Sequence, residues 1–290
     1  LEGSSIAQSF SRKLVEVFCG QLAAALASTA AHEKALEKSK AYSRYAAWES
    51  SRLLGVDDPA HVKLGDHVAQ NLVVMVLDIR SFVSLSEDMS KKEMFLFINS
   101  YLGYVAPLVA RHHGVINKYL GDGFMALFDY EERAVQHAAQ CAMELIEATR
   151  VYNELNRSSH PNFPRTLDAA RVPFTVGIGL HHGPVIMGAM GCESRMELSV
   201  LGEPANLASR IEGLTKYYLT SVLAHDDFQS GLESYVSRRK LPLTMLRGSS
   251  ETIRIWELYG GDSMEQIELK QSYVDKYDKT IELIDNGEIE

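Results

Sequence analysis

A run of apolar residues that ends in an aspartate is the feature that most constrains the fold of this chain. Residues 72–77 are all apolar, and Asp78 follows them directly. A short continuous run of this kind predicts a strand that is buried on both faces. Because an ionised carboxylate is costly to bury alone, Asp78 must cap the next helix, pair with another group or bind a ligand.

The pattern around this run alternates between strand and helix. We expect strands over 73–79, 115–119, 124–128, 174–180, 184–190, 221–224 and 253–258, helices over 90–113, 131–156 and 204–213, and a polar loop over 158–171. Gly121-Asp122-Gly123 predicts one hairpin turn, and His181-His182-Gly183 predicts a second. The order predicts an α+β fold, with a mixed sheet and helices on one face.

The first 54 residues have the composition of one long helix. No proline precedes Pro59, and apolar residues recur at steps of three and four between Ile6 and Leu26. Two interpretations remain: an amphipathic helix packed on its own domain, or a helix that pairs with its twin in a parallel coiled coil and transmits a signal. We favour the second, because the pattern outlasts an ordinary globular helix. The predicted organisation is completed by a linker over 55–69, a main domain over 70–260 and a C-terminal helical tail over 261–290.

Charge and cysteine content exclude several classes of protein. The formal net charge of −9 argues against a broad nucleic-acid-binding surface, which needs clustered Lys and Arg. The three cysteines include no CxxC pair, which fits free thiols in a reducing, cytoplasmic setting. No apolar run approaches the roughly 18 residues that span a bilayer, so we expect no membrane contact from this piece. Since the chain begins at Leu1, we expect it to be a fragment.

Two aspartates provide candidate metal ligands. Asp122 lies in the first predicted turn, where Asp before Gly is also favoured by conformation alone. Asp78 and Asp122 both lie at ends of elements that neighbouring strands can bring together. Two adjacent carboxylates repel each other unless a cation joins them, and oxygen ligands suit Mg²⁺ or Mn²⁺.

The helix that begins at Pro204 carries two further candidates. Asn206 and Arg210 are four residues apart and therefore share one helix face. The simpler interpretation is a solvated amide and a surface ion pair. The functional interpretation is an arginine that contacts triphosphate oxygens and an amide that orients a ribose.

Five motifs together resemble the class III adenylyl/guanylyl cyclase catalytic domain. They lie at residues 77–82, 117–122, 177–183, 188–191 and 201–210, and the resemblance covers residues 64–258. Each motif is weak alone, but the set in this order is highly specific. The resemblance implies a ferredoxin-like core with a largely antiparallel sheet, and a head-to-tail homodimer with active sites at the interface. Residues 10–18 also resemble the closing helix of a GAF sensor domain.

The resemblance implies a role for each candidate residue. One subunit would supply Asp78, Asp122 and the carbonyl of Ile79 to two Mg²⁺ or Mn²⁺ ions, and its partner would supply Asn206 and Arg210. The ions would assist attack of the ribose 3′-oxygen on the α-phosphate, while Arg210 would stabilise charge on that phosphate. The implied activity is an adenylate cyclase, which converts ATP to 3′,5′-cyclic AMP and pyrophosphate in signal transduction.

Four further residues match substrate-binding positions of the family. A lysine at Lys118 donates to adenine N1, and the hydroxyl of Ser199 accepts from the N6 amino group, so ATP is favoured over GTP. Ser199 departs from the usual Asp or Thr, which predicts looser selectivity. Phe82 follows Ser81, where the family often has glycine, and backbone N–H groups there would receive phosphate oxygens. Arg247 replaces a lysine that contacts the terminal phosphates.

Three alternatives remain open at this point. They are a guanylate cyclase, a diguanylate cyclase and a catalytically inactive module used for dimerisation or nucleotide sensing. The diguanylate cyclase is disfavoured, since its Gly-Gly-Asp/Glu-Glu-Phe signature is absent from the sequence. The histidine pairs at 112–113 and 181–182 each precede a glycine and lack zinc-ligand spacing, so we interpret them as structural.

Overall fold

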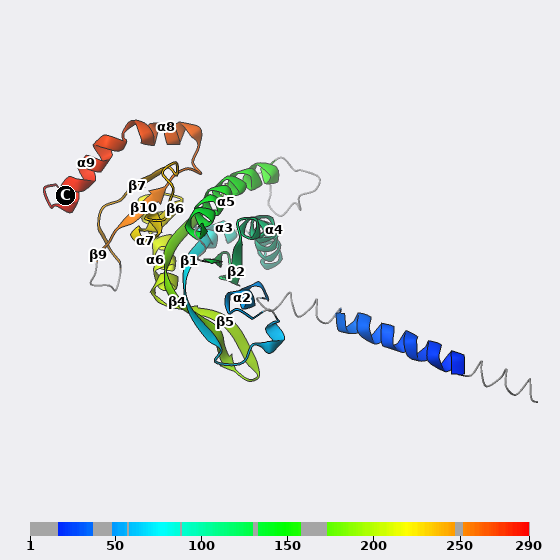
Figure 1. Cartoon of the computed structure of the whole chain (residues 1–290). Helices are drawn as coiled ribbons and strands as arrows, with labels where there is room; N and C mark the ends of the chain where they lie inside the picture. Colours follow the sequence, from blue (N-terminus) through cyan, green and yellow to red (C-terminus); the bar gives the residue numbers. More distant parts are fainter. Residues whose placement is uncertain are drawn as a thin grey trace, which may run out of the picture. The chain divides into compact units, whose positions relative to one another are not determined.

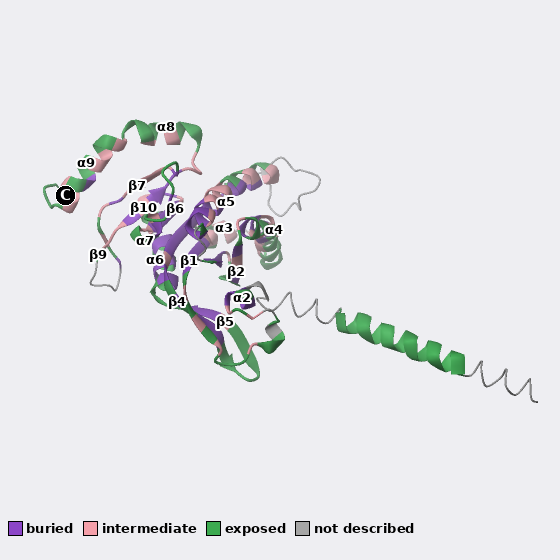
Figure 2. Ribbon diagram, in the orientation of Figure 1, coloured by how far each residue is buried: buried purple, intermediate pink, exposed green. Residues whose placement is uncertain are grey.

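The computed structural model describes residues 17–36, 48–56, 58–87, 89–129, 133–157, 173–246 and 252–289. The chain divides into two compact units, Leu1–Trp48 and Glu49–Glu290. In the first unit, residues 17–36 form one helix whose residues are all exposed (Figure 2). Most of the GAF-like stretch over 10–18, the predicted loop over 158–171 and Arg247 lie outside the described residues. Pairing of the helix with a twin stays a prediction.

The second unit is built on an eight-stranded sheet (Figure 1). Its strand order is β2-β3-β1-β4-β6-β10-β7, with β5 paired to β4. The bounds are β1 His67–Ile79, β2 Gly114–Tyr119, β3 Phe124–Asp129, β4 Val176–Cys192, β5 Arg195–Leu201, β6 Val222–His225, β7 Arg238–Lys240 and β10 Ile255–Leu258. β4 and β6 pair in parallel and the other pairs are antiparallel, so the predicted mixed, largely antiparallel sheet is confirmed. Strands β8 (Thr244–Met245) and β9 (Thr252–Ile253) form a small separate sheet.

Helices cover both faces of the main sheet. The described helices beyond residue 47 are α2 Trp48–Leu53, α3 Phe82–Ser86, α4 Lys91–Arg111, α5 Ala134–Arg157, α6 Glu203–Tyr218, α7 Asp226–Gln229, α8 Met264–Ser272 and α9 Val274–Asp285, with a 3₁₀ turn at Pro59–His61. Neighbouring residues of β1 point to opposite faces. Val73 and Met75 pack in the core that holds α4 and α5, whereas Val74 packs with Ala208 of α6. The prediction of helices on one face is therefore wrong for α6.

Helix α4 shows why length and composition alone do not identify a membrane span. With 21 residues it is long and apolar enough to cross a bilayer. However, Phe97, Tyr101, Val105 and Val109 on one side of it pack in the same core as α5 and the sheet. A capping box at Ser90 starts the helix, since its hydroxyl accepts from the backbone N–H of the third helical residue. α4 is thus a core helix of this fold.

Strand β4 is one continuous strand and not the predicted hairpin around His181-His182-Gly183. It pairs with β1 over thirteen residues, from His67↔Gly188 to Ile79↔Val176, and turns back into β5 only after Cys192. The long strand β1 offers a hydrogen-bonding partner along this whole length, so the chain has no reason to reverse in the middle. Gly183 serves close packing instead, because a Cβ there would lie 3.0 Å from Pro204.

Helix α6 lies directly on the backbone of β4. A Cβ at Gly179 would come within 2.1 Å of the Ala208 carbonyl oxygen, and one at Gly177 would meet the α6 side chains. Glycine at these alternating positions lets the helix approach the strand more closely than any side chain allows. The helix runs on to Tyr218 and is followed by Leu219 in the left-handed region at φ 54°. The prediction that it ends at Gly213 is therefore wrong.

Candidate active site

The β2–β3 hairpin brings Asp122 next to Asp78. β1 and β3 pair antiparallel, with Leu77 opposite Phe124, so the turn before β3 lies over the end of β1. A Cβ at Gly123 would lie 1.9 Å from the carbonyl oxygen of Leu77, which means that the turn rests on the strand itself. The side chains of Asp78 and Asp122 share a hydrogen bond. The structure therefore brings the two predicted carboxylates into contact.

Burial strongly perturbs the acidity of Asp78. Burial first, and then the negative charges of Asp122 and Glu212, together raise the pKa of its carboxyl to about 7, while Lys216 opposes them. Two touching carboxylates cannot both ionise without a compensating positive charge. A donor set made of carboxylate oxygens fits a hard cation such as Mg²⁺ or Mn²⁺. Ile79, whose carbonyl is the third predicted ligand, is the last residue of β1 and is buried.

Two charged residues complete this cluster and were not predicted as part of the site. Glu212 is only 7% exposed on the sheet-facing side of α6. Burial raises the pKa of its carboxyl, Lys216 and Arg80 lower it, and Asp122 raises it. The guanidinium of Arg80 donates to the carbonyl oxygen of Thr220, and burial lowers its pKa while Glu212 opposes that shift. Asp78 thus lies near the carboxylates of Asp122 and Glu212 and the ammonium of Lys216, while Arg80 acts on Glu212.

The spacing of residues in the sequence of α6 indicates that Glu212 is buried. Ala208, Glu212 and Thr215 are spaced by four and three residues and form the buried stripe of α6. A glutamate on such a stripe is unusual, because a carboxylate is almost never fully buried without a partner. The step of four from Ala208 was therefore enough to mark Glu212 as a residue with an internal electrostatic role.

Asn206 and Arg210 lie on the opposite side of α6, where both are exposed. Neither makes a hydrogen bond or an ion pair with any of the residues that the structure describes. Arg210 is also absent from the charges that act on Asp78. Within one chain the structure therefore does not bring this pair to the carboxylates, and both side chains remain available to a second chain.

A buried amide links the two strands that carry the predicted base-reading residues, Lys118 and Ser199. The pairing of β2 with β3 shifts register between Ile116 and Lys118. Asn117, which lies at this irregularity, is 7% exposed and donates from Nδ2 to the carbonyl oxygen of Leu198 at 3.1 Å. Lys118 and Ser199 directly follow these two bonded residues. The bond thus links the strand of the exposed lysine to the strand of the buried serine.

Phe82 is placed differently from a free substrate-binding side chain. Its ring stacks on Phe97, with ring centroids 6.4 Å apart and an interplanar angle of 9°, and it packs against the main core. A substrate contact from Phe82 must therefore come from its backbone at the start of α3. The preceding Ser81 has φ 53°, in the left-handed region that favours glycine.

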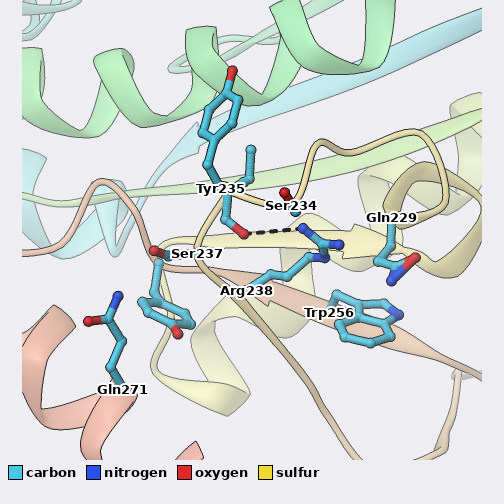
Figure 3. A pocket seen from close by; sticks show the side chains of 9 residues that line it. Gln229, Ser234, Tyr235, Ser237, Arg238, Trp256 and Gln271 are labelled. Carbon is cyan, nitrogen blue, oxygen red and sulfur yellow. Dashed lines mark hydrogen bonds between the residues drawn. The ribbon is translucent and has the colours of Figure 1, made fainter.

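A separate hollow of about 420 Å³ lies near Tyr235, Arg238 and Trp256 (Figure 3). The Arg238 guanidinium donates to the carbonyl oxygens of Glu233 at 2.9 Å and Val236 at 3.2 Å, so its charge is partly engaged. None of the described candidate residues lines this hollow. It is therefore distinct from the carboxylate site.

Comparison with known proteins identifies a matching family and related sequences. Residues 66–222 match the family model described as the adenylate and guanylate cyclase catalytic domain. Adenylate cyclase from Anabaena cylindrica is 32% identical over 203 residues, which cover 68% of this chain and 38% of that protein. Adenylate cyclase 1 from Rhizobium meliloti (strain 1021) is 29% identical over 194 residues, covering 66% and 28%. The chain thus spans well under half the length of either relative.

Solved structures share the fold. The adenylyl cyclase CyaB from P. aeruginosa gives a TM-score of 0.58 at 21% identity, covering 66% of this chain and 95% of that one. A bacterial light-regulated adenylyl cyclase gives 0.65 at 20% identity, covering 83% and 68%. The guanylyl cyclase Cya2 gives 0.56 at 25% identity, covering 67% and 93%. The predicted α+β cyclase fold is confirmed, and because the family model matches more than half of its length, this chain belongs to the adenylate and guanylate cyclase catalytic domain family.

Proposed function

We propose that this chain is an adenylate cyclase that forms 3′,5′-cyclic AMP and pyrophosphate from ATP at sites shared between two copies. One observation carries the proposal: Asp78 and Asp122 touch within one chain, while Arg210 faces outward from α6. A single chain therefore holds two half-sites, and a head-to-tail homodimer completes both. The relatives named adenylate cyclase support this assignment.

In this proposal the residues of the chain bind and orient the nucleotide. Two Mg²⁺ or Mn²⁺ ions, when bound, would activate the ribose 3′-oxygen and neutralise charge on the leaving pyrophosphate. Asp78, Asp122 and the carbonyl of Ile79 would hold them. Asn206 of the second copy orients the ribose, and Arg210 of that copy donates hydrogen bonds to the α-phosphate as its charge develops. Arg247 is proposed to contact the terminal phosphates.

Base selectivity is proposed to rest on Lys118 and Ser199. The lysine donates to adenine N1, and guanine, which has N1–H there, would meet a second donor instead. The hydroxyl of Ser199 both donates and accepts, so it discriminates less than an aspartate does. A guanylate cyclase is therefore the second candidate, and the adaptable hydroxyl of Ser199 is the observation that favours it.

The dimer is proposed to be held in register by the helix over residues 17–36. Its large apolar residues, which are Val17, Phe18, Leu22, Leu26 and Leu36, are all exposed. A stripe of this kind on an isolated helix finds cover by pairing with an identical helix. We also propose that the enzyme acts in the cytoplasm, a reducing compartment in which free thiols such as Cys19, Cys141 and Cys192 stay unpaired.

The decisive experiment identifies the product. The purified chain is incubated with ATP or GTP, each with Mg²⁺ or Mn²⁺, and the products are separated by chromatography. We expect cyclic AMP to exceed cyclic GMP by at least about tenfold. Asp122→Asn should abolish the reaction, whereas Glu193→Gln, an exposed carboxylate in the β4–β5 turn, should leave it intact. A dominant cyclic GMP product would identify a guanylate cyclase. Metal-dependent nucleotide binding without turnover would identify an inactive module.

A further inference from the structure

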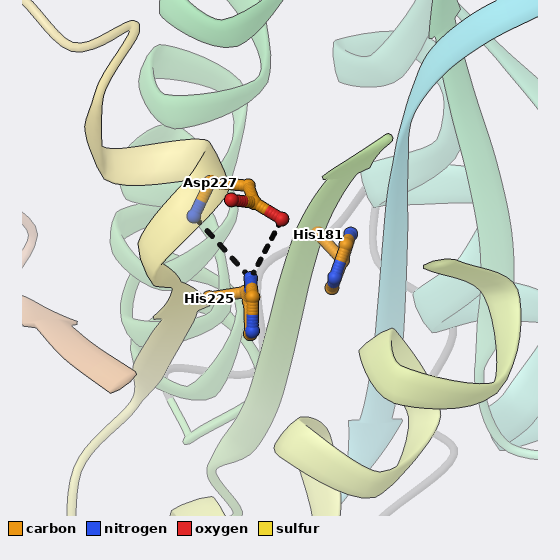
Figure 4. Close-up of side chains that lie close together, drawn as sticks. All are labelled: His181, His225 and Asp227. Atoms are coloured by element: carbon orange, nitrogen blue, oxygen red, sulfur yellow. Dashed lines mark hydrogen bonds and ion pairs between the residues drawn. The ribbon is translucent and has the colours of Figure 1, made fainter. Parts of the chain in front are cut away.

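Two histidines and an aspartate converge at a second place in the fold, away from the carboxylate site (Figure 4). β4 and β6 pair in parallel with Leu180 opposite Ala224, so the next residues, His181 and His225, lie side by side. Their rings stack with centroids 4.3 Å apart. Asp227 follows in α7, and one ligand atom from each of the three side chains lies within 4.8 Å of the other two.

We propose that His181, His225 and Asp227 form a binding site for a first-row transition-metal ion such as Zn²⁺. Nδ1 of His225 lies 3.3 Å from a carboxylate oxygen of Asp227. Two ligand atoms of a tetrahedral zinc ion lie about 3.4 Å apart, given zinc–ligand bonds of about 2.1 Å. Two of the three ligands are therefore already spaced for an ion, and the ring of His181 must approach by up to about 1.4 Å, since the three ligand atoms lie within 4.8 Å of one another.

The hydrogen bonding of both rings favours an ion. The backbone N–H of Asp227 donates to Nδ1 of His225 at 3.3 Å, which is long for such a bond and therefore weak. His181 is 4% exposed, and its Nδ1 makes no hydrogen bond with any described residue. A buried polar atom without a partner destabilises the fold. Coordination to a metal ion would give Nδ1 of His181 a partner.

The protonation state of His181 also suits a ligand. Burial, together with the neighbouring His225, lowers the pKa of the ring to about 4. The ring is therefore neutral at pH 7, so no proton has to leave before the nitrogen lone pair can coordinate. Charge from Asp227 opposes this shift and would offset part of the charge of a bound ion.

The donor set identifies the class of ion. Two imidazoles and one carboxylate suit Zn²⁺, Co²⁺ or Ni²⁺, whereas Mg²⁺ prefers oxygen ligands only. The Asp227 side chain is 66% exposed, so an ion can enter from solvent and keep a water as its fourth ligand. The site is thus chemically distinct from the carboxylates of Asp78 and Asp122. It also revises the interpretation of His181 as a purely structural residue, because its partners lie far along the chain.

A bound ion would join three elements of the unit. It would connect the middle of β4 to the end of β6 and to α7, a helix of only four residues. The site also lies beside the start of α6, because a Cβ at Gly183 would contact both His181 and Pro204. We therefore expect the ion to stabilise the part of the fold that supports α6.

The test uses a chain in which the carboxylate site cannot bind metal. The Asp78→Asn/Asp122→Asn double variant is treated with EDTA, dialysed into excess Mg²⁺ and titrated with Co²⁺. We expect the intense visible absorption of tetrahedral Co²⁺, saturation at one ion per chain, displacement by Zn²⁺ and a higher melting temperature. Adding Asp227→Asn or His225→Gln should weaken Co²⁺ binding by at least about tenfold. His67→Gln, which removes an exposed imidazole elsewhere, should leave it unchanged.

Two results would overturn the proposal. One is a weak, octahedral Co²⁺ spectrum in the double variant. The other is a binding constant that Asp227→Asn leaves intact, or that His67→Gln reduces equally. Because Asp227 is largely exposed, the Asp227→Asn variant is expected to fold. If His225→Gln does not fold, Asp227→Asn alone tests whether the proposed site binds the ion. Neither result depends on cyclase activity, so the outcome is independent of the proposed function.

Discussion

Replacing Asp78 by asparagine should stabilise the metal-free protein at pH 8 while abolishing catalysis. The pKa of this carboxyl rises from an ordinary 3.8 to about 7. The folded chain therefore holds the proton more tightly than the unfolded chain, and stability falls as the pH rises from about 4 to about 7. About three pH units correspond to roughly 4 kcal/mol. Because Asp78 is only half-buried, solvent screening reduces this to about 1–2 kcal/mol.

The assay is urea denaturation in EDTA at pH 5 and pH 8. Asp78→Asn should exceed the wild type by about 1–2 kcal/mol at pH 8 and by clearly less at pH 5, because the folded wild-type carboxyl is protonated there. Glu193→Gln serves as the exposed control and should change neither value. Mg²⁺ should stabilise the wild type and not the asparagine variant. A variant that is less stable than the wild type at pH 8, or a gain that is larger at pH 5, would refute the reasoning.

Three further predictions test the dimer, the base contact and the turn. Asp78→Ala and Arg210→Ala chains, each inactive alone, should recover about a quarter of wild-type cyclic AMP formation when they are mixed in equal amounts. Half of the dimers are then mixed, and each mixed dimer has one intact site. No recovery would argue against shared sites. Lys118→Glu should shift the ratio of cyclic GMP to cyclic AMP toward cyclic GMP, because a carboxylate accepts from guanine N1–H; an unchanged ratio would remove Lys118 from base recognition. Gly123→Ala should lower the free energy of unfolding in urea by about 3 kcal/mol, because its Cβ meets a strand carbonyl oxygen at 1.9 Å. Gly213→Ala, which meets no described atom within 4 Å on α6, should raise it by about 0.5–1 kcal/mol; equal effects of the two would contradict the close contact at the turn.

Local patterns were sufficient to predict most elements of the main sheet. The apolar run before Asp78 predicts the buried part of β1, and the Asp122-Gly123 turn predicts the β2–β3 hairpin. The start of β1 at His67 was not predicted, because residues 67–71 alternate in exposure and are polar in part. They are in the strand because β4 extends far enough to pair with them, which is a property of the partner.

Two errors arose where a glycine was interpreted as the end of an element but lies inside one. His181-His182-Gly183 has the composition of a turn, yet Gly183 lies within β4 and makes room for Pro204. Gly213 has the appearance of a helix end, yet α6 continues because its buried stripe extends to Thr215. In both cases contacts with elements distant in sequence determine the structure, and local composition does not indicate these contacts.

The candidate site, too, could be predicted from the sequence only in part. Asp78 and Asp122 could be placed together from the order of the strands, since each lies at an element end. The opposing charges of Glu212 and Arg80 could not, because their proximity depends on how closely α6 approaches the sheet. The catalytic roles of these carboxylates, and of Arg210, stay predictions until activity is measured.

The glycines under α6 have a consequence for regulation. With backbone pressed against backbone at Gly179, the helix has no layer of side chains over which to slide or roll. The backbone of Arg210 is therefore held against the sheet of its own chain. In the proposed homodimer, an incoming signal would change the distance between an arginine and the opposing carboxylates by pivoting one whole subunit against the other.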